Sequence, residues 1–423
     1  MSRKPRAFNF DPFAFSLSKL SGGVSVYHNL NLPVPTLLVG AVFFSGSREE
    51  PKGKWGVGHF MEHLPFRGTD AFPNKVALTA PIENLGGVIN AWTSHEEIVF
   101  LVKTAPEDLP LGLKALTEII FRARNGKSDF RDEFSAVVEE LGDNLSNPAY
   151  KTIEEALKRL FRGHPLGHSP LGTAESLKAL CLRDVRDFYE SRIKNGPFAL
   201  VVLGNAREDT ILGQLEAVFG KVQPPVKTRL TVAHKQSRKE EVILERLPYP
   251  RTHLFLGGTA FSATDSKNAT VAEVFETMLT KGLSSPLFHA LREDEGLVYG
   301  YNFSYDSWSD AGVVWFSAST KMRNARRIQR IFFETAQGVA DDKRRFALAK
   351  EMLLKANRLE EWTLFDILNE TARCLTRVGK PPSSRQDEEA RITAVTHDRV
   401  RRFAETYLNE ERFLTVILKG QAE

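Results

Sequence analysis

Two histidines and a glutamate stand at helical spacing in residues 58–63, which read GHFMEH. Positions i, i+3 and i+4 of a helix share a face, so His59 and His63 can direct two imidazoles at one ion, with Glu62 beside them. Zinc lowers the pKa of a bound water to about 7, and a neighbouring carboxylate can then take its proton. The H-x-x-E-H order, the inverse of H-E-x-x-H, therefore predicts a zinc site with Glu62 as general base.

A catalytic zinc site also needs a third protein ligand and an open position. Residues 133–140 have a helical pattern in which Glu139 and Glu140 follow Glu133 by about two turns. Spacing alone leaves both Glu139 and Glu140 open as ligands, and a solvated helix face would also explain such acidic residues. In a chain with ten histidines the motif could be accidental, so by itself it is a hypothesis.

Composition limits the classes of protein to consider. The chain has 423 residues, 42% of them apolar, which suits two globular domains of about 200 residues each. Its net charge of +4 comes from 57 basic and 53 acidic residues, and this near-balance argues against a dedicated nucleic-acid binder. Two cysteines, Cys181 and Cys374, are too few for a disulfide framework and lack metal spacing, which favours a reducing compartment.

The sequence predicts no membrane span, because no run reaches the roughly 20 apolar residues that a transmembrane helix needs. Residues 1–10 are basic but have no apolar core and no small-residue cleavage pattern, so we interpret them as a mature N-terminus. We therefore expect a cytoplasmic protein, with an organellar presequence as the alternative.

Hydrophobic periodicity predicts strands and helices in a similar order in both halves of the chain. The expected strands cover residues 24–26, 37–44, 88–102, 198–203, 241–247, 253–256, 299–319 and 413–418, and the expected helices cover residues 109–160, 269–281, 286–293 and 325–378, with breaks. Pro65, two positions after His63, is expected to end the metal-binding helix early.

An internal repeat supports a duplication. Six apolar residues recur 215 positions later, in both copies as a helix followed by a strand. They are Val185, Phe188, Ile193, Phe198, Val202 and Leu203, matched by Val400, Phe403, Leu408, Phe413, Ile417 and Leu418. A common helix–strand pattern is the alternative explanation. The polar, Pro-containing residues 223–239 are the expected linker between domains at 1–222 and 240–423.

Further motifs resemble the M16 family of metallopeptidases, which includes pitrilysin, insulin-degrading enzyme and the mitochondrial processing peptidase. The resemblance covers nearly the whole chain and is carried by residues 58–63, 66–69, 82–87, 90–94, 164–167, 171–173, 284–288, 291–293 and 296–299. It implies two α+β domains of the same M16/LuxS-like metallohydrolase fold, each a mainly antiparallel β-sheet covered by α-helices on one side.

The resemblance also implies roles for particular residues. Glu140 matches the third zinc ligand and Glu133 a second functional glutamate, while Glu139 remains the rival ligand. The family uses an open edge strand to pair with the substrate backbone, which here places Asn90, Ala91 and Thr93 at the substrate. For Asn90 a satisfied polar residue at a strand bend is the alternative.

In the family, an arginine and a tyrosine of the second domain reach the zinc site. Here they are Arg292, which could anchor the peptide, and Tyr299, which could stabilise the oxyanion. Each could otherwise be an ordinary surface residue.

These observations predict a zinc endopeptidase with one Zn²⁺ per chain that cleaves short or unfolded peptides, such as leader or targeting peptides. The chain has half the length of full-size family members, so we expect a homodimer or a heterodimer with a related chain. The alternative is a non-catalytic M16-like structural or peptide-binding subunit, as in the core proteins of a respiratory complex.

Overall fold

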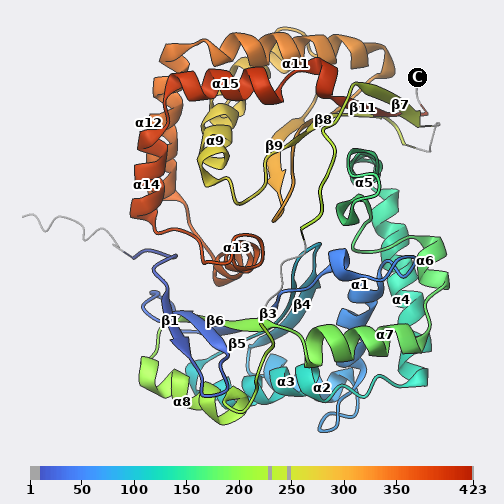
Figure 1. Cartoon of the computed structure of the whole chain (residues 1–423), viewed down its shortest axis with the longest axis vertical. Coiled ribbons are helices and arrows are strands. Elements are labelled where there is room, and N and C mark those ends of the chain that lie inside the picture. The colour runs from blue at the N-terminus through green and yellow to red at the C-terminus, as the bar shows by residue number, and fades with distance from the viewer. Residues whose placement is uncertain (1–9, 227–230, 245–248, 422–423) are drawn as a thin grey trace, which may run out of the picture. The chain divides into compact units, whose positions relative to one another are not determined.

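A computed structural model describes residues 10–226, 231–244 and 249–421, which form two compact units (Figure 1). The first unit comprises Met1–Leu141, Ser169–Arg229 and Glu361–Arg385. The second unit comprises Gly142–His168, Leu230–Glu360 and Gln386–Glu423. Each unit therefore takes a segment from the other half of the chain. The compact units differ in this respect from the predicted contiguous domains at 1–222 and 240–423.

The first unit contains a six-stranded sheet in the order β1-β2-β6-β3-β5-β4. Its strands are β1 (Ser16–Lys19), β2 (Ser25–Asn29), β3 (Leu37–Phe43), β4 (Val88–Thr93), β5 (Ile98–Thr104) and β6 (Phe198–Gly204). Only the β2–β6 pair is parallel among these neighbours. Every residue of β3 and β6 is buried, so these two apolar strands need cover on both faces of the sheet.

The second unit contains a five-stranded sheet in the order β7-β11-β8-β10-β9. Its strands are β7 (Glu240–Leu244), β8 (Thr252–Ala260), β9 (Tyr301–Ser307), β10 (Gly312–Thr320) and β11 (Leu414–Leu418). The β11–β7 pair is parallel and the other pairs are antiparallel. Residues 245–247 of the predicted strand 241–247 lie outside the described residues.

The two sheets repeat one topology. β2, β6, β3, β5 and β4 of the first sheet correspond in order and direction to β7, β11, β8, β10 and β9 of the second. The repeated apolar residues lie on α7 (Leu182–Phe188) and the following turn with β6, and on α15 (His397–Tyr407) and the following turn with β11. All of them are buried. The predicted duplication and α+β class are confirmed.

Helices occupy most of the remaining chain. They are α1 (Val57–His63), α2 (Lys75–Glu83), α3 (Leu109–Phe121), α4 (Lys127–Ser146), α5 (Pro148–Leu160), α6 (Ala174–Lys178), α8 (Glu208–Phe219), α9 (Ser266–Thr280), α10 (Pro286–Phe288), α11 (Ala325–Ala340), α12 (Lys343–Leu359), α13 (Leu364–Arg377) and α14 (Arg385–Ala394).

Helices cover both faces of the first sheet, so the predicted one-sided cover is wrong there. α3 packs on one face, where a Cβ at Gly112 would lie 3.3 Å from the Val102 side chain. α13 packs on the other face, with Ile367, Leu368 and other apolar residues against β3, β5 and β6.

The second sheet is covered in the same way. Leu254 and Leu256 of β8 face a core formed with α9, α11 and α15, whereas Phe255 between them packs against Ala156 of α5. The helices on the second faces, α5 and α13, are thus the segments that the units exchange. Shifted by the 215 positions of the repeat, α13 falls on residues 149–162, which nearly coincide with α5.

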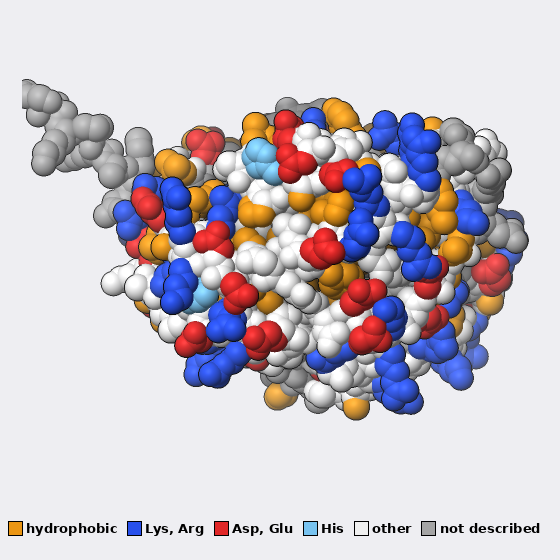
Figure 2. Space-filling model, turned by 90° about the horizontal axis from the view of Figure 1, so that it is seen from above, with side chains coloured by type: hydrophobic (Ala, Val, Ile, Leu, Met, Phe, Trp, Pro, Cys, Tyr) orange, Lys and Arg blue, Asp and Glu red, His pale blue; other side chains and the backbone are white. Residues whose placement is uncertain are grey.

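Within the ranges that the structure describes, no helix combines the length and apolar character needed to span a bilayer. On the face shown in Figure 2, Lys and Arg side chains are interspersed with Asp and Glu, and hydrophobic side chains lie between them.

The close approach of α13 to the first sheet can be tested at Gly40 of β3. A Cβ there would lie 2.6 Å from Cδ1 and 2.9 Å from Cδ2 of Leu368, which is fully buried. We expect Gly40→Ala to lower the free energy of unfolding by about 1–3 kcal/mol through overpacking. Leu368→Ala should cost about 2–5 kcal/mol by leaving a cavity.

Chemical denaturation of both single variants and the double variant measures the coupling. The double variant should lose less than the sum of the two single losses, because truncating Leu368 makes room for the new methyl group. Gly338→Ala on α11 is the control, since nothing lies within 4 Å of a Cβ at that position. If the double variant loses the sum of the two single losses in free energy of unfolding, Leu368 does not pack closely against Gly40.

Candidate metal centre

The helix that carries the motif is short and is held at its N-terminus by a carboxylate. α1 has seven residues and begins after Gly56, whose φ of 88° suits glycine. The buried side chain of Glu50 accepts hydrogen bonds from the backbone N–H of Gly56 at 2.9 Å and of Gly58 at 2.8 Å. A negative charge at this end of a helix also interacts favourably with the helix dipole.

The helix ends where the sequence predicted. α1 stops at His63, and a single 3₁₀ turn, Leu64–Arg67, follows with Pro65 inside it. The helix continues far enough for both motif histidines to lie on it, so Pro65 removes no metal ligand.

An aromatic contact joins α1 to α4, the helix with the predicted third ligand. Phe60 of α1 is fully buried and stacks on Phe130 of α4, with ring centroids 4.8 Å apart. Phe134, one turn further along α4, lies 6.4 Å from the same ring. This packing fixes the distance between the two helices that supply the predicted ligands.

Three side chains converge on one point between these helices. Nε2 of His59 lies 3.2 Å from Nε2 of His63, and Glu140 Oε1 and Oε2 lie 3.5 Å and 3.4 Å from these two nitrogens. A tetrahedral zinc ion with bonds of about 2.0–2.1 Å separates its ligand atoms by about 3.3 Å. The donor types and their spacing therefore fit a zinc ion.

The structure distinguishes the two candidate third ligands. Glu140 lies on the face of α4 that also carries the buried Glu133 and Val137, and its carboxylate reaches both histidines. Glu139 is exposed and belongs to no metal-binding cluster among the described residues. Hydrogen bonding to His59 lowers the pKa of Glu140 and outweighs its partial burial, so the carboxylate stays ionised.

Glu133 contacts the ring nitrogen of His63 that faces away from His59 and Glu140. Its Oε1 lies 2.8 Å from Nδ1 of His63, and its Oε2 accepts a hydrogen bond from Arg67. A carboxylate on the second nitrogen fixes the tautomer and orientation of a metal-binding histidine. These contacts place Glu133 where it can position His63, and its predicted catalytic role stays a prediction.

The pKa values of this pair follow from the same contacts. Burial alone would raise the pKa of Glu133, but its hydrogen bonds to His63 and Arg67 bring it below the usual value. Burial would lower the pKa of His63, but the hydrogen bond to Glu133 and three nearby carboxylates raise it above the usual value. These contacts favour the charged form of His63, so a metal at Nε2 would compete with a proton.

Glu62 is buried beside the histidines and is held by one hydrogen bond. Its Oε2 accepts from the Thr93 hydroxyl at 2.8 Å. Burial raises the pKa of Glu62, and this effect outweighs the opposing charge of His59 and the Thr93 hydrogen bond. A raised pKa moves a carboxylate toward the range in which a general base works well near neutral pH.

The predicted substrate strand lies at the sheet edge. β4 is the last strand of the first sheet and pairs only with β5 within it. Asn90 is exposed, and its side-chain oxygen accepts a hydrogen bond from the Ala91 N–H at 2.9 Å. The hydroxyl of Thr93 is bonded to Glu62, and the predicted place of Thr93 at the substrate stays a prediction. The roles of Asn90 and Ala91 stay predictions.

Arg292 and Tyr299 lie together in the second unit. The Arg292 guanidinium lies 5.1 Å from the Tyr299 ring centre, and its Nη1 donates to the Tyr299 carbonyl at 3.1 Å. The Tyr299 side chain is 74% exposed. The two residues form an accessible pair, and their convergence with the metal centre of the first unit stays a prediction.

Sequence reasoning missed two side chains of this site. Arg67 lies four positions after His63, a helical spacing that could have suggested its contact with the same carboxylate. Glu50 gives no such signal, because it precedes the helix by a loop and acts only once that loop has folded back.

The site and the fold together define a class: duplicated α+β proteins with an inverted zinc-binding motif in the first unit. Residues 28–174 match the family model described as insulinase, peptidase family M16, and residues 180–353 match the model described as peptidase M16 inactive domain. The chain belongs to the M16 peptidase family.

Known proteins similar to the chain agree with this assignment. It is 26% identical over 416 residues, 94% of this chain and 88% of the relative, to an uncharacterized zinc protease of Streptomyces coelicolor. The fold matches the structure of a peptidase M16 inactive domain from Pseudomonas fluorescens, with a TM-score of 0.84 and 16% identity over 96% of this chain and 98% of the other. It also matches a protease from Helicobacter pylori, with a TM-score of 0.83 and 19% identity over 96% and 99%.

The ligand set makes a testable prediction. Purified protein should carry about one zinc ion per chain, measured by elemental analysis, because a single tetrahedral site takes one ion. His59→Ala and His63→Ala should each lose most of the metal. Glu140→Gln should weaken zinc binding, whereas the matched variant Glu139→Gln should leave it unchanged. Loss of zinc from Glu139→Gln alone would contradict the assignment of Glu140.

Proposed function

We propose that the protein is a zinc-dependent endopeptidase that cleaves short or unfolded peptides, with Glu62 as the general base. The observation that carries this proposal is the tetrahedral spacing of the donors of His59, His63 and Glu140 beside a buried carboxylate. Zinc held there would supply a Lewis acid that lowers the pKa of a water molecule.

The chain's own residues supply the rest of the chemistry. Glu62 accepts the proton of the attacking water and later returns it to the leaving amine of the cut peptide bond. Glu133 holds His63 in the orientation that keeps Nε2 toward the metal. The edge of β4 at Asn90 and Ala91 offers main-chain groups that can align an extended peptide, which selects for chain shape more than for side chains.

The second unit contributes a cation and a phenol to the proposed mechanism. Arg292 anchors the peptide, and Tyr299 donates a hydrogen bond to the oxyanion that forms at the attacked carbonyl. Their exposure and their contact with each other are compatible with these roles.

A second candidate is a non-catalytic M16-like subunit that binds peptides or partner chains. The similarity to an M16 domain described as inactive favours it. A complete donor set with a buried neighbouring carboxylate favours the peptidase, since a structural subunit has no need of either. Zinc content and cleavage of a quenched peptide, measured together, separate the two candidates. A dimer and a cytoplasmic location stay predictions.

Substitution of the general base separates metal binding from chemistry. Glu62→Gln keeps the size of the side chain but cannot accept a proton. We expect it to retain zinc and bind peptide while turnover falls by at least about 10²-fold. The measurement is kcat on one quenched peptide with zinc content in parallel. Near-normal turnover would mean that another residue is the base.

Substitutions in the second unit test its part in the reaction. Tyr299→Phe removes one hydroxyl and should lower kcat by about 10²- to 10³-fold, because that is the usual cost of losing one oxyanion donor. Arg292→Ala removes a charge and should also raise KM. Both variants should keep their zinc. Wild-type cleavage rates in both would show that the pair takes no part in cleavage.

A further inference from the structure

Two turns beside the metal centre are fixed against each other. The 3₁₀ turn η1 (Ser47–Glu49) follows β3, and residues 94–97 connect β4 to β5. The N–H groups of Ser47 and Arg48 donate to the carbonyls of Ser94 and His95, each at 3.0 Å. A Cβ at Gly46 would lie 2.5 Å from the Ser94 carbonyl oxygen, so the two turns lie too close for a larger residue.

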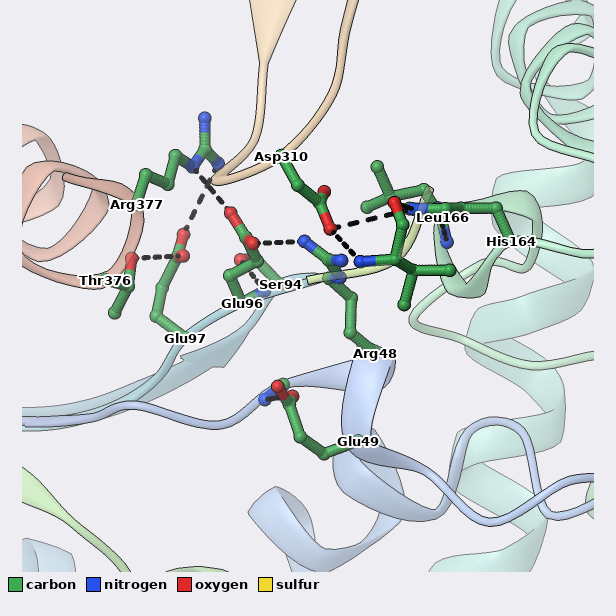
Figure 3. A network of polar contacts seen from close by, with 12 residues as sticks. Arg48, Glu49, Ser94, Glu96, Glu97, His164, Leu166, Asp310, Thr376 and Arg377 are labelled. Atoms are coloured by element: carbon green, nitrogen blue, oxygen red, sulfur yellow. Dashed lines mark hydrogen bonds and ion pairs between the residues drawn. The ribbon is translucent and has the colours of Figure 1, made fainter. Parts of the chain in front are cut away.

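Buried charges reinforce this contact and bring in α13 (Figure 3). Arg48 Nη1 donates to Glu96 Oε1 at 2.5 Å. Arg377 of α13 places Nε 3.6 Å from Glu96 and Nη2 3.8 Å from Glu97. The Thr376 hydroxyl donates to Glu97 at 3.2 Å.

The buried carboxylates of this network are stabilised by their arginine partners. Two arginines face two glutamates, and the four side chains are between 1% and 12% exposed. Removing one partner from a buried ion pair is costly, because it leaves the other charge without compensation. Without Arg377, Glu96 and Glu97 would each lose an ion pair, which weakens the hold on the turn that carries them.

Each turn is adjacent in sequence to a residue that contacts α1. Glu50, next to η1, caps the N-terminus of α1. Thr93, immediately before the other turn, holds the carboxylate of Glu62. The network therefore connects α13 to both supports of the proposed general base.

We propose that Arg377, acting through Glu96 and Glu97, is a positioning residue that keeps Thr93 in place to orient Glu62. The proposal rests on the proposed function of Glu62. It makes α13, a helix from the far end of the chain, part of the working peptidase unit. A role confined to stability would instead leave the geometry of Glu62 unchanged.

The test compares four variants of the full-length, zinc-loaded protein on one quenched peptide. Thr93→Val removes the hydroxyl at nearly constant shape, whereas Thr93→Ser keeps the hydroxyl. Arg377→Met removes the guanidinium, and Arg373→Met is the control on the same helix, where Arg373 is 39% exposed and pairs only loosely with Glu370. A displacement of about 1 Å at a reacting group can cost up to about 10²-fold in rate.

We expect Thr93→Val and Arg377→Met to lower kcat at least about tenfold, with KM and zinc content close to wild type. Thr93→Ser and Arg373→Met should retain most of the activity. Wild-type kcat in folded Arg377→Met would overturn the proposal, as would zinc loss that accounts for the lost activity. If Arg377→Met does not fold, Arg377→Lys replaces it, because it keeps the charge but loses the forked donors.

Crystal structures of the variants test the positioning role independently of peptidase activity. If zinc-loaded wild type cuts no peptide, the proposed function fails, but the position of Glu62 can still be compared between variants. A Glu62 carboxylate displaced in both Thr93→Val and Arg377→Met supports the positioning role. A carboxylate in its wild-type place in Arg377→Met overturns it.

Discussion

A helix of seven residues cannot persist by itself, since isolated helices shorter than about 12–15 residues are marginal in water. Both motif histidines lie on such a helix, so the surrounding unit has to hold α1 in place. Glu50 caps its start, Phe60 packs on Phe130 of α4, and Val57 and Met61 are buried. The precision of the ligand geometry is thus a property of the whole unit and not of the motif.

Much of the site could be predicted from the sequence, because local spacing determines it. His59 and His63 needed only one helical turn, whereas spacing left both Glu139 and Glu140 open and only the family resemblance favoured Glu140. The hydroxyl of Thr93 on Glu62 could not be predicted in this way, because it joins a strand to a helix 31 positions away. The β-edge motif predicted a substrate contact for that threonine and gave no sign of its bond to Glu62.

The architecture was predictable in part for a similar reason. Alternating and continuous apolar runs located most strands of both sheets, and the 215-residue repeat identified their equivalence. The short polar strand β1 was not predicted, and the single predicted stretch 88–102 is two strands, β4 and β5. The exchange of α5 and α13 was not predictable, because the apolar stripe of a helix shows that it packs but not on which sheet. The metal-binding residues are not duplicated. α9 follows β8 in the second unit as α1 follows β3 in the first, but α9 carries no histidine.

The exchange of helices also sets an order of events during synthesis. The first sheet has all its strands once β6 is complete at Gly204, yet the helix that covers its second face begins only at Leu364. At roughly 5–20 residues per second, a ribosome needs roughly 10–30 s to make the chain between them. During that interval Leu38, Val42 and Leu101 lack the cover that α13 supplies, and exposed apolar surface of this kind makes a nascent chain prone to aggregation.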